Sequence, residues 1–135
     1  MKTLLSVTGV LELGAGLALL ICPSVFVALL VGGTLETAAA WVVARVGAAA
    51  LLALGVACWA ARNDSRNDAA RGVVHAMVLY NLGVALALGA AGFQALGVGV
   101  LLWPTVILHA VMAGWCLVAL RSEPGKALPP ERAAG

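Results

Sequence analysis

Long apolar runs separated by short polar connections dominate the chain. Four runs reach the roughly 20 residues that a helix needs to cross a bilayer. They cover residues 4–22, 38–61, 72–92 and 97–120. None of them alternates apolar and polar positions as a barrel strand does, and lipid offers the backbone no hydrogen-bonding partner. The pattern therefore predicts an all-α fold, an integral membrane four-helix bundle within residues 1–121.

Two further segments lie outside these runs. Residues 24–33 are apolar, follow Pro23 and are too short to cross a bilayer alone. They either extend the first helix to about residue 32 past a proline kink or lie in the outer interface, and the sequence favours the kinked extension. Residues 122–135 are polar and rich in proline, so we expect a disordered cytoplasmic tail.

The basic residues predict the orientation of the bundle. Seven of the eight Lys and Arg side chains fall at the N-terminus, in the connection between the second and third runs, or in the tail, namely Lys2, Arg62, Arg66, Arg71, Arg121, Lys126 and Arg132. An even number of crossings puts these three regions on one side, which the positive-inside rule makes cytoplasmic. We therefore expect a multi-pass protein of the inner (cytoplasmic) membrane with both termini inside.

Composition narrows the class of protein. With 63% hydrophobic and 10% charged residues, the chain lacks the polar side chains that a water-facing surface requires, so its expected environment is the lipid bilayer. A formal net charge of +2 is too small for nucleic-acid binding. No catalytic motif is present, and no two His, Cys or acidic residues recur at metal-ligand spacing within a run. The sequence predicts no enzyme, no catalytic residues, no metal and no cofactor.

Ionisable residues inside the runs are costly to bury and therefore informative. At 1.5 Å per residue from the cytoplasmic ends, Glu12 lies roughly 12 Å deep, Asn81 roughly 14 Å and His109 roughly 16 Å. These three share a layer near the midplane, so we expect Glu12 to form hydrogen bonds with Asn81 and His109. Tyr80 is a polar neighbour of Asn81, and Thr105 lies one helical turn from His109. The arrangement is either a polar clasp that sets helix register or a site that handles protons or a substrate.

Arg45 completes the candidate buried polar or binding site, which is Glu12, Arg45, Tyr80, Asn81, Thr105 and His109. A salt bridge between Glu12 and Arg45 is disfavoured, because side chains lean toward the N-terminus of their helix and the first two helices run in opposite directions. Arg45 is expected to extend toward the outer headgroups or Glu36 instead, unless a kink or tilt brings the pair together.

Glycines within the runs predict close helix packing. Gly9 and Gly16 share a face of the first run with Glu12, while the second run carries Gly47 and Gly55, and the third carries Gly83 and Gly89. Small residues let helix backbones approach closely in lipid, where packing replaces the hydrophobic drive. Such faces suit packing within the bundle, a homo-oligomer or a larger membrane complex.

Several of these positions together resemble small four-helix bacterial membrane proteins of the DoxX-like group. The resemblance is based on residues 9–23 (GVLELGAGLALLICP), 44–47, Tyr80 and Asn81, and 101–104 through His109. It implies a four-helix bundle in a bacterial cytoplasmic membrane. Some members are associated with respiratory or thiol-redox complexes, but this chain has no redox residues to which that association transfers. Small multidrug-resistance transporters are similar in having four short helices and a glutamate in the first, while Arg45 and His109 depart from them.

Three functional hypotheses follow. The first is an accessory or scaffolding membrane protein, or a complex subunit, with a buried polar cluster. The second is a small proton-coupled transporter or a small-molecule or lipid binder that uses Glu12. The third is a subunit of a membrane redox complex.

Overall fold

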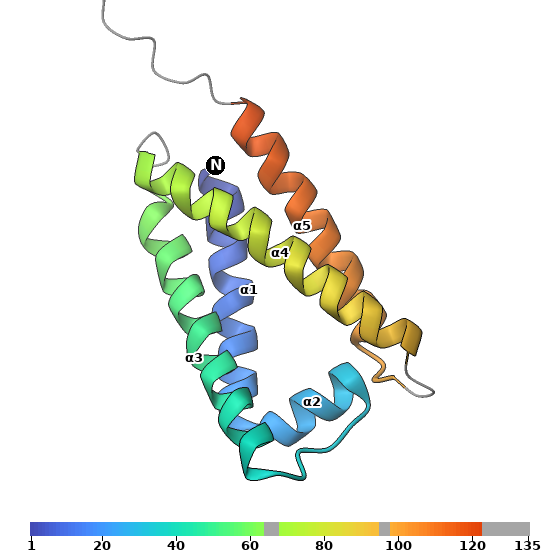
Figure 1. Cartoon of the computed structure of the whole chain (residues 1–135). Helices are drawn as coiled ribbons and strands as arrows, with labels where there is room; N and C mark the ends of the chain where they lie inside the picture. The colour runs from blue at the N-terminus through green and yellow to red at the C-terminus, as the bar shows by residue number, and fades with distance from the viewer. Residues whose placement is uncertain (64–67, 95–97, 123–135) are drawn as a thin grey trace, which may run out of the picture.

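The structure is a computed structural model that describes residues 1–63, 68–94 and 98–122. Over these ranges the chain forms five helices and no strand, namely α1 (Lys2–Ile21), α2 (Pro23–Val31), α3 (Ala38–Ala61), α4 (Asp68–Gln94) and α5 (Leu102–Ser122) (Figure 1). Four of them, α1, α3, α4 and α5, are long and apolar enough to cross a membrane. The predicted all-α class with four long apolar helices is confirmed, and these helices indicate a multi-pass membrane protein.

The helix bounds follow local chemistry. α3 covers residues 38–61 as expected, and the Thr37 hydroxyl caps its start by accepting a hydrogen bond from the Ala40 amide at 3.1 Å. α4 begins at Asp68, four residues earlier than its apolar run. α5 begins at Leu102 rather than at residue 97, with Pro104 in its first turn, where the missing N–H of proline costs no helical bond.

Two expectations fall partly on residues that the structure does not describe. The predicted disordered tail starts at Ser122, which is the last residue of α5, and its remaining residues lie outside the described ranges. Arg66 and residue 97, the expected start of the fourth run, also lie outside them.

The long helices associate as two antiparallel pairs, α1 with α3 and α4 with α5 (Figure 1). Glycines bring the first pair together: a Cβ on Gly16 would lie 3.0 Å from the Leu52 backbone nitrogen, and one on Gly55 would lie 2.9 Å from that of Leu13. Such close backbone approach is what small residues provide in membrane helices. Gly9 also packs against α3, so part of the predicted glycine packing occurs within the chain.

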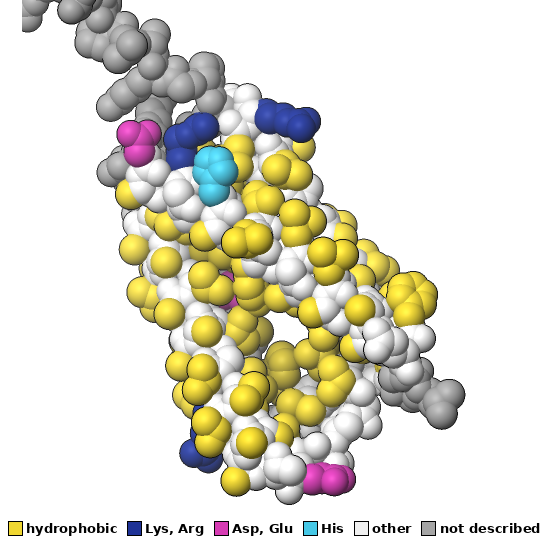
Figure 2. Space-filling view, viewed as in Figure 1, with side chains coloured by type: hydrophobic (Ala, Val, Ile, Leu, Met, Phe, Trp, Pro, Cys, Tyr) yellow, Lys and Arg dark blue, Asp and Glu magenta, His cyan; other side chains and the backbone are white. Residues whose placement is uncertain are grey.

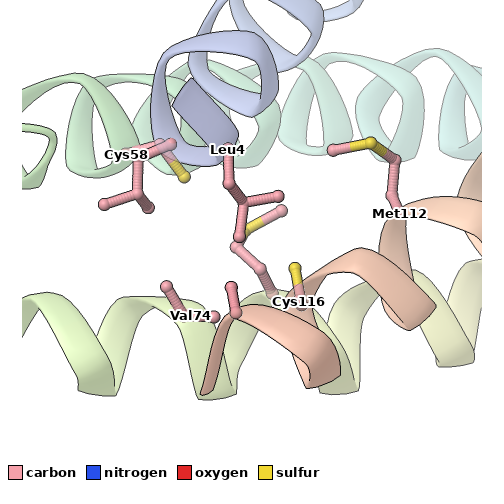
Figure 3. Packing of buried hydrophobic residues seen from close by; sticks show 8 residues of the cluster. Leu4, Cys58, Val74, Met112 and Cys116 are labelled. Atoms are coloured by element: carbon pink, nitrogen blue, oxygen red, sulfur yellow. The ribbon is translucent and has the colours of Figure 1, made fainter. Parts of the chain in front are cut away.

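The two pairs meet at one end of the molecule and diverge toward the other (Figure 1). At the meeting point, buried side chains from all four long helices form one cluster, which includes Leu4, Cys58, Val74, Met112 and Cys116 (Figure 3). The N-terminus, the end of α3, the start of α4 and the end of α5 all lie at this end (Figure 1). A chain that crosses a membrane four times with both termini on one side needs these four helix ends at the same membrane surface.

α2 differs from the kinked extension of the first helix that the sequence favours. The chain leaves helical geometry at Cys22 (φ −127°, ψ 57°), and α2 starts at Pro23 and turns away from α1 into the space between the diverging pairs (Figure 1). The Leu101 amide donates to the Leu29 carbonyl oxygen at 2.9 Å, which ties the end of α2 to the segment preceding α5. A Cβ on Gly99 would lie 2.1 Å from that same oxygen, so only glycine permits this contact.

Candidate functional site

A cavity of about 540 Å³ occupies the wedge between the helix pairs. Its walls are largely apolar and include Phe26 and Leu30 of α2, Leu51 of α3, and Leu88 of α4. The space-filling view shows the molecule hollowed between α2 and the diverging pairs (Figure 2). The polar side chains that line this cavity are Thr8, Glu12, Tyr80, Asn81, Thr105 and His109. Five of the six candidate site residues therefore share one cavity.

Glu12 lies in the wall that α1 contributes and is only 6% exposed. The Tyr80 hydroxyl of α4 donates a hydrogen bond to its Oε2 atom at 3.1 Å. This partner corrects the expectation that Asn81 and His109 would bind Glu12. Adjacent residues on a helix point about 100° apart, so Tyr80 faces α1 while Asn81 faces α5.

Asn81 and His109 instead bind each other. The Asn81 Oδ1 atom lies 2.7 Å from His109 Nδ1, and the Asn81 Nδ2 atom donates to the Met77 carbonyl oxygen at 2.7 Å. Because Asn81 uses its amide nitrogen as a donor, Oδ1 must accept, which assigns the proton on His109 to Nδ1. The Tyr80 and His109 rings meet edge to face with centroids 5.5 Å apart, so the two hydrogen-bonded pairs form one polar cluster.

Arg45 lies apart from this cluster. Its side chain is exposed and lines a second, smaller pocket at the junction of α1 and α2, beside Cys22 and Trp41. In the described ranges it forms no ion pair with Glu12. Of the six candidate site residues, Arg45 is therefore the one that the structure does not bring to the cavity.

Thr8 is a site residue that the sequence reasoning missed. It lies one helical turn before Glu12 on the same face of α1 and is 2% exposed. Its hydroxyl has no hydrogen-bond partner among the described residues, although a helical threonine often bonds to the carbonyl four residues earlier. The i, i+4 spacing of Thr8 and Glu12 was the signal that would have identified it.

The cluster lacks the features of a metal or thiol site. The part of the chain that the structure describes contains no group of three His, Cys, Asp or Glu side chains able to hold a metal ion. Cys58 and Cys116 are buried as free thiols in the hydrophobic cluster at the meeting point of the helices. What the site offers is a large apolar wall with hydrogen-bonding groups gathered at one place, the usual composition of a small-molecule pocket.

We compared the chain with known proteins. No family model, no curated protein and no solved structure matches it. The resemblance to the DoxX-like group therefore stays a prediction.

Proposed function

We propose that this protein is a multi-pass membrane protein that binds a largely apolar small molecule, taken from the bilayer, in the cavity between its helix pairs. The observation that supports this function is one cavity of about 540 Å³ whose apolar walls surround the polar cluster of Glu12, Tyr80, Asn81 and His109. Ligand pockets measure about 300–1,000 Å³ and combine apolar walls with a few placed polar groups. The protein lies in the inner membrane with both termini in the cytoplasm.

The glycine faces give less support to the scaffolding role that the sequence placed first. Gly9, Gly16 and Gly55 are used in contacts between α1 and α3 of the same chain. Gly83 and Gly89 have open space around the position of a Cβ and remain free for a partner helix. A subunit role is compatible with ligand binding, but a polar cluster that only set helix register would not need a cavity beside it.

Gly14 provides a direct test, because it lines the cavity and a Cβ there would meet nothing within 4 Å. Gly14→Leu should fill part of the cavity without disturbing the helices. Wild-type protein purified from its own membranes in mild detergent should carry a co-purifying small molecule at near one per chain, detected by mass spectrometry. We expect Gly14→Leu to carry at least about tenfold less, corresponding to a loss of about 1.4 kcal/mol or more in binding.

Gly114→Leu is the matched control. Gly114 of α5 also has open space at its Cβ position, but it does not line the cavity, so this variant should retain the wild-type occupancy. Equal occupancy in wild type and both variants, or a wild-type protein that carries no small molecule, would contradict the proposed function.

A further inference from the structure

Three polar atoms at the polar cluster have no hydrogen-bond partner among the described residues. They are Thr8 Oγ1, the Oε1 atom of Glu12, and the Nε2 atom of His109. Tyr80 occupies only Oε2 of Glu12, and Asn81 occupies only Nδ1 of His109. All three residues line the same cavity. A buried hydroxyl without a partner is destabilising, so the Thr8 hydroxyl in particular points to a ligand.

These atoms share one hydrogen-bonding character. Since the Asn81 carbonyl oxygen receives the Nδ1 proton, the neutral His109 ring presents Nε2 as a lone-pair acceptor. A Glu12 carboxylate accepts at both oxygens, and the Thr8 hydroxyl accepts as well as donates. Tyr80 donates its O–H to Glu12, and Asn81 donates one of its two amide N–H groups to the Met77 carbonyl. The remaining donors are the second N–H of Asn81 and the hydroxyls of Thr8 and Thr105, and each of these hydroxyls also accepts, so acceptors outnumber donors at the polar end of the cavity.

The charges around the cavity also favour a ligand that donates hydrogen bonds. The titratable groups around Glu12 are Tyr80, which donates to it, the buried Cys58 thiol, and His109 in the same cavity, and none of them is a fixed cation. Arg45 lines a different pocket, and no Lys or Arg lines this cavity. A carboxylate enclosed by apolar helices needs a counter-charge, and within the described ranges the chain supplies none at this site.

We propose that the ligand is a lipophilic amine whose ammonium group donates hydrogen bonds to Glu12 Oε1, Thr8 Oγ1 and His109 Nε2. The proposal rests on the proposed function, since it names the ligand class of the same cavity. A primary ammonium carries three N–H donors and one positive charge, which match three acceptors and one carboxylate. Its hydrocarbon chain lies against the apolar wall toward Phe26 and Leu30 of α2.

Other amphiphiles match this end of the cavity less well. A long-chain alcohol brings one donor and no charge, so it leaves the carboxylate without a counter-charge. A fatty acid places a second acidic group beside Glu12. A quaternary ammonium supplies the charge but has no N–H to offer Thr8 or His109. Amphiphiles with the same hydrocarbon chain and different head groups therefore distinguish the contributions of hydrogen bonding, charge and apolar contact to binding.

The test uses the full-length protein in phosphatidylcholine nanodiscs, with binding of radiolabelled dodecylamine measured against empty nanodiscs. We expect saturable binding at one molecule per chain. Unlabelled dodecylamine should compete at least about tenfold better than dodecanol, dodecanoic acid or dodecyltrimethylammonium. Glu12→Gln should weaken binding at least about tenfold, and Thr8→Val by about three- to tenfold.

Glu36→Gln and Thr3→Val are matched controls, because both residues are exposed and lie outside the cavity; these variants should bind as wild type does. Dodecanol competing as well as dodecylamine, with Gly14→Leu abolishing both, would overturn the amine assignment and leave the proposed function standing. Absence of saturable binding by every probe, together with equal co-purification from wild type and Gly14→Leu, would overturn both. Competition with wild-type protein tests the head group even if a variant fails to fold.

Discussion

The polar residues of the cavity illustrate a constraint that acts on single side chains in lipid. A buried amide or imidazole must find its partners on neighbouring helices, because no solvent replaces them. Asn81 is 1% exposed and meets this constraint with two bonds, one to His109 of α5 and one to its own helix. His109 depends on Asn81 for the partner of Nδ1. The two residues should therefore contribute to stability as a unit.

A double-mutant cycle checks this coupling. We expect Asn81→Leu and His109→Leu each to lower the free energy of unfolding by about 1–2 kcal/mol, because each leaves one buried polar group unpaired. The double variant should lose less than the sum by about 0.6 kcal/mol, the average coupling for hydrogen bonds between membrane helices, and by no more than about 1.7 kcal/mol. Unfolding in mixed detergent and SDS micelles, followed by circular dichroism, measures all four proteins.

His75→Leu supplies the control cycle. The His75 Nδ1 atom bonds to the Arg71 carbonyl oxygen on the exposed surface of α4, away from Asn81. Combined with Asn81→Leu, it should give additive changes. A coupling between Asn81 and His109 no larger than that of the control pair would show that the observed bond does not contribute to stability.

At the scale of single residues, the sequence was sufficient to identify the polar residues of the cavity but not their hydrogen-bond partners. Depth along each helix was enough to place Glu12, Asn81 and His109 in one layer. The choice of Tyr80 rather than Asn81 as the partner of Glu12 depends on the rotation of α4 about its axis, which spacing within one helix does not fix. Arg45 was expected to extend away from Glu12, and its exposed side chain lies in a separate pocket.

At the scale of helices, close backbone approach holds α1 against α3. A side chain at Gly55 would place its Cβ 2.9 Å from the Leu13 backbone nitrogen, a distance that real contacts do not reach, so the helices would have to separate. We expect Gly55→Val to lower the free energy of unfolding by about 1–3 kcal/mol, the usual cost of overpacking. The same micelle unfolding assay measures this change.

Gly89→Val serves as the matched control, because a Cβ at Gly89 of α4 meets nothing within 4 Å. Both variants introduce the same β-branched residue into a long apolar helix, so their intrinsic helix preferences change equally. Gly89→Val should therefore stay within about 0.5 kcal/mol of wild type. Equal destabilisation by the two substitutions would mean that the α1–α3 contact is not the cause.

The position of α2 could not be predicted from its local sequence. Pro23 permits a kinked continuation of α1 as readily as a new helix, because proline is tolerated in the first turn. What fixes α2 across the wedge is the bond between the Leu29 carbonyl and the Leu101 amide, together with the close approach of Gly99. These residues are far apart in the chain, so no pattern within residues 24–33 reports the contact.

At the scale of the whole molecule, the cavity results from the angle between the two helix pairs. They share the hydrophobic cluster at one end, and α2 spans the gap at the other (Figure 1). The apolar length of each helix was readable from the sequence, since crossing a bilayer sets it. The angle between pairs arises from contacts among all of them, which is why the polar layer was predicted and the cavity beside it was not.

The distribution of charge over the molecule predicts its orientation in the membrane. Lys2, Arg62, Arg71 and Arg121 belong to the end where α1 and α4 begin and α3 and α5 end, while the opposite end holds Arg45 and Glu36. The positive-inside rule therefore predicts that this end faces the cytoplasm. Asn63, after α3, and Thr34, between α2 and α3, are exposed positions at the two ends. Replacing each by cysteine gives a probe for each side.

The labelling should use a Cys22→Ser background, because Cys22 is exposed whereas Cys58 and Cys116 are buried. In intact cells a membrane-impermeant maleimide should modify Thr34→Cys and leave Asn63→Cys unmodified. After lysis both should react to the same extent, which shows that the difference comes from the membrane and not from the local environment of each thiol. Modification of Asn63→Cys in intact cells with protection of Thr34→Cys would invert the orientation and place the joined ends of the helix pairs outside the cell.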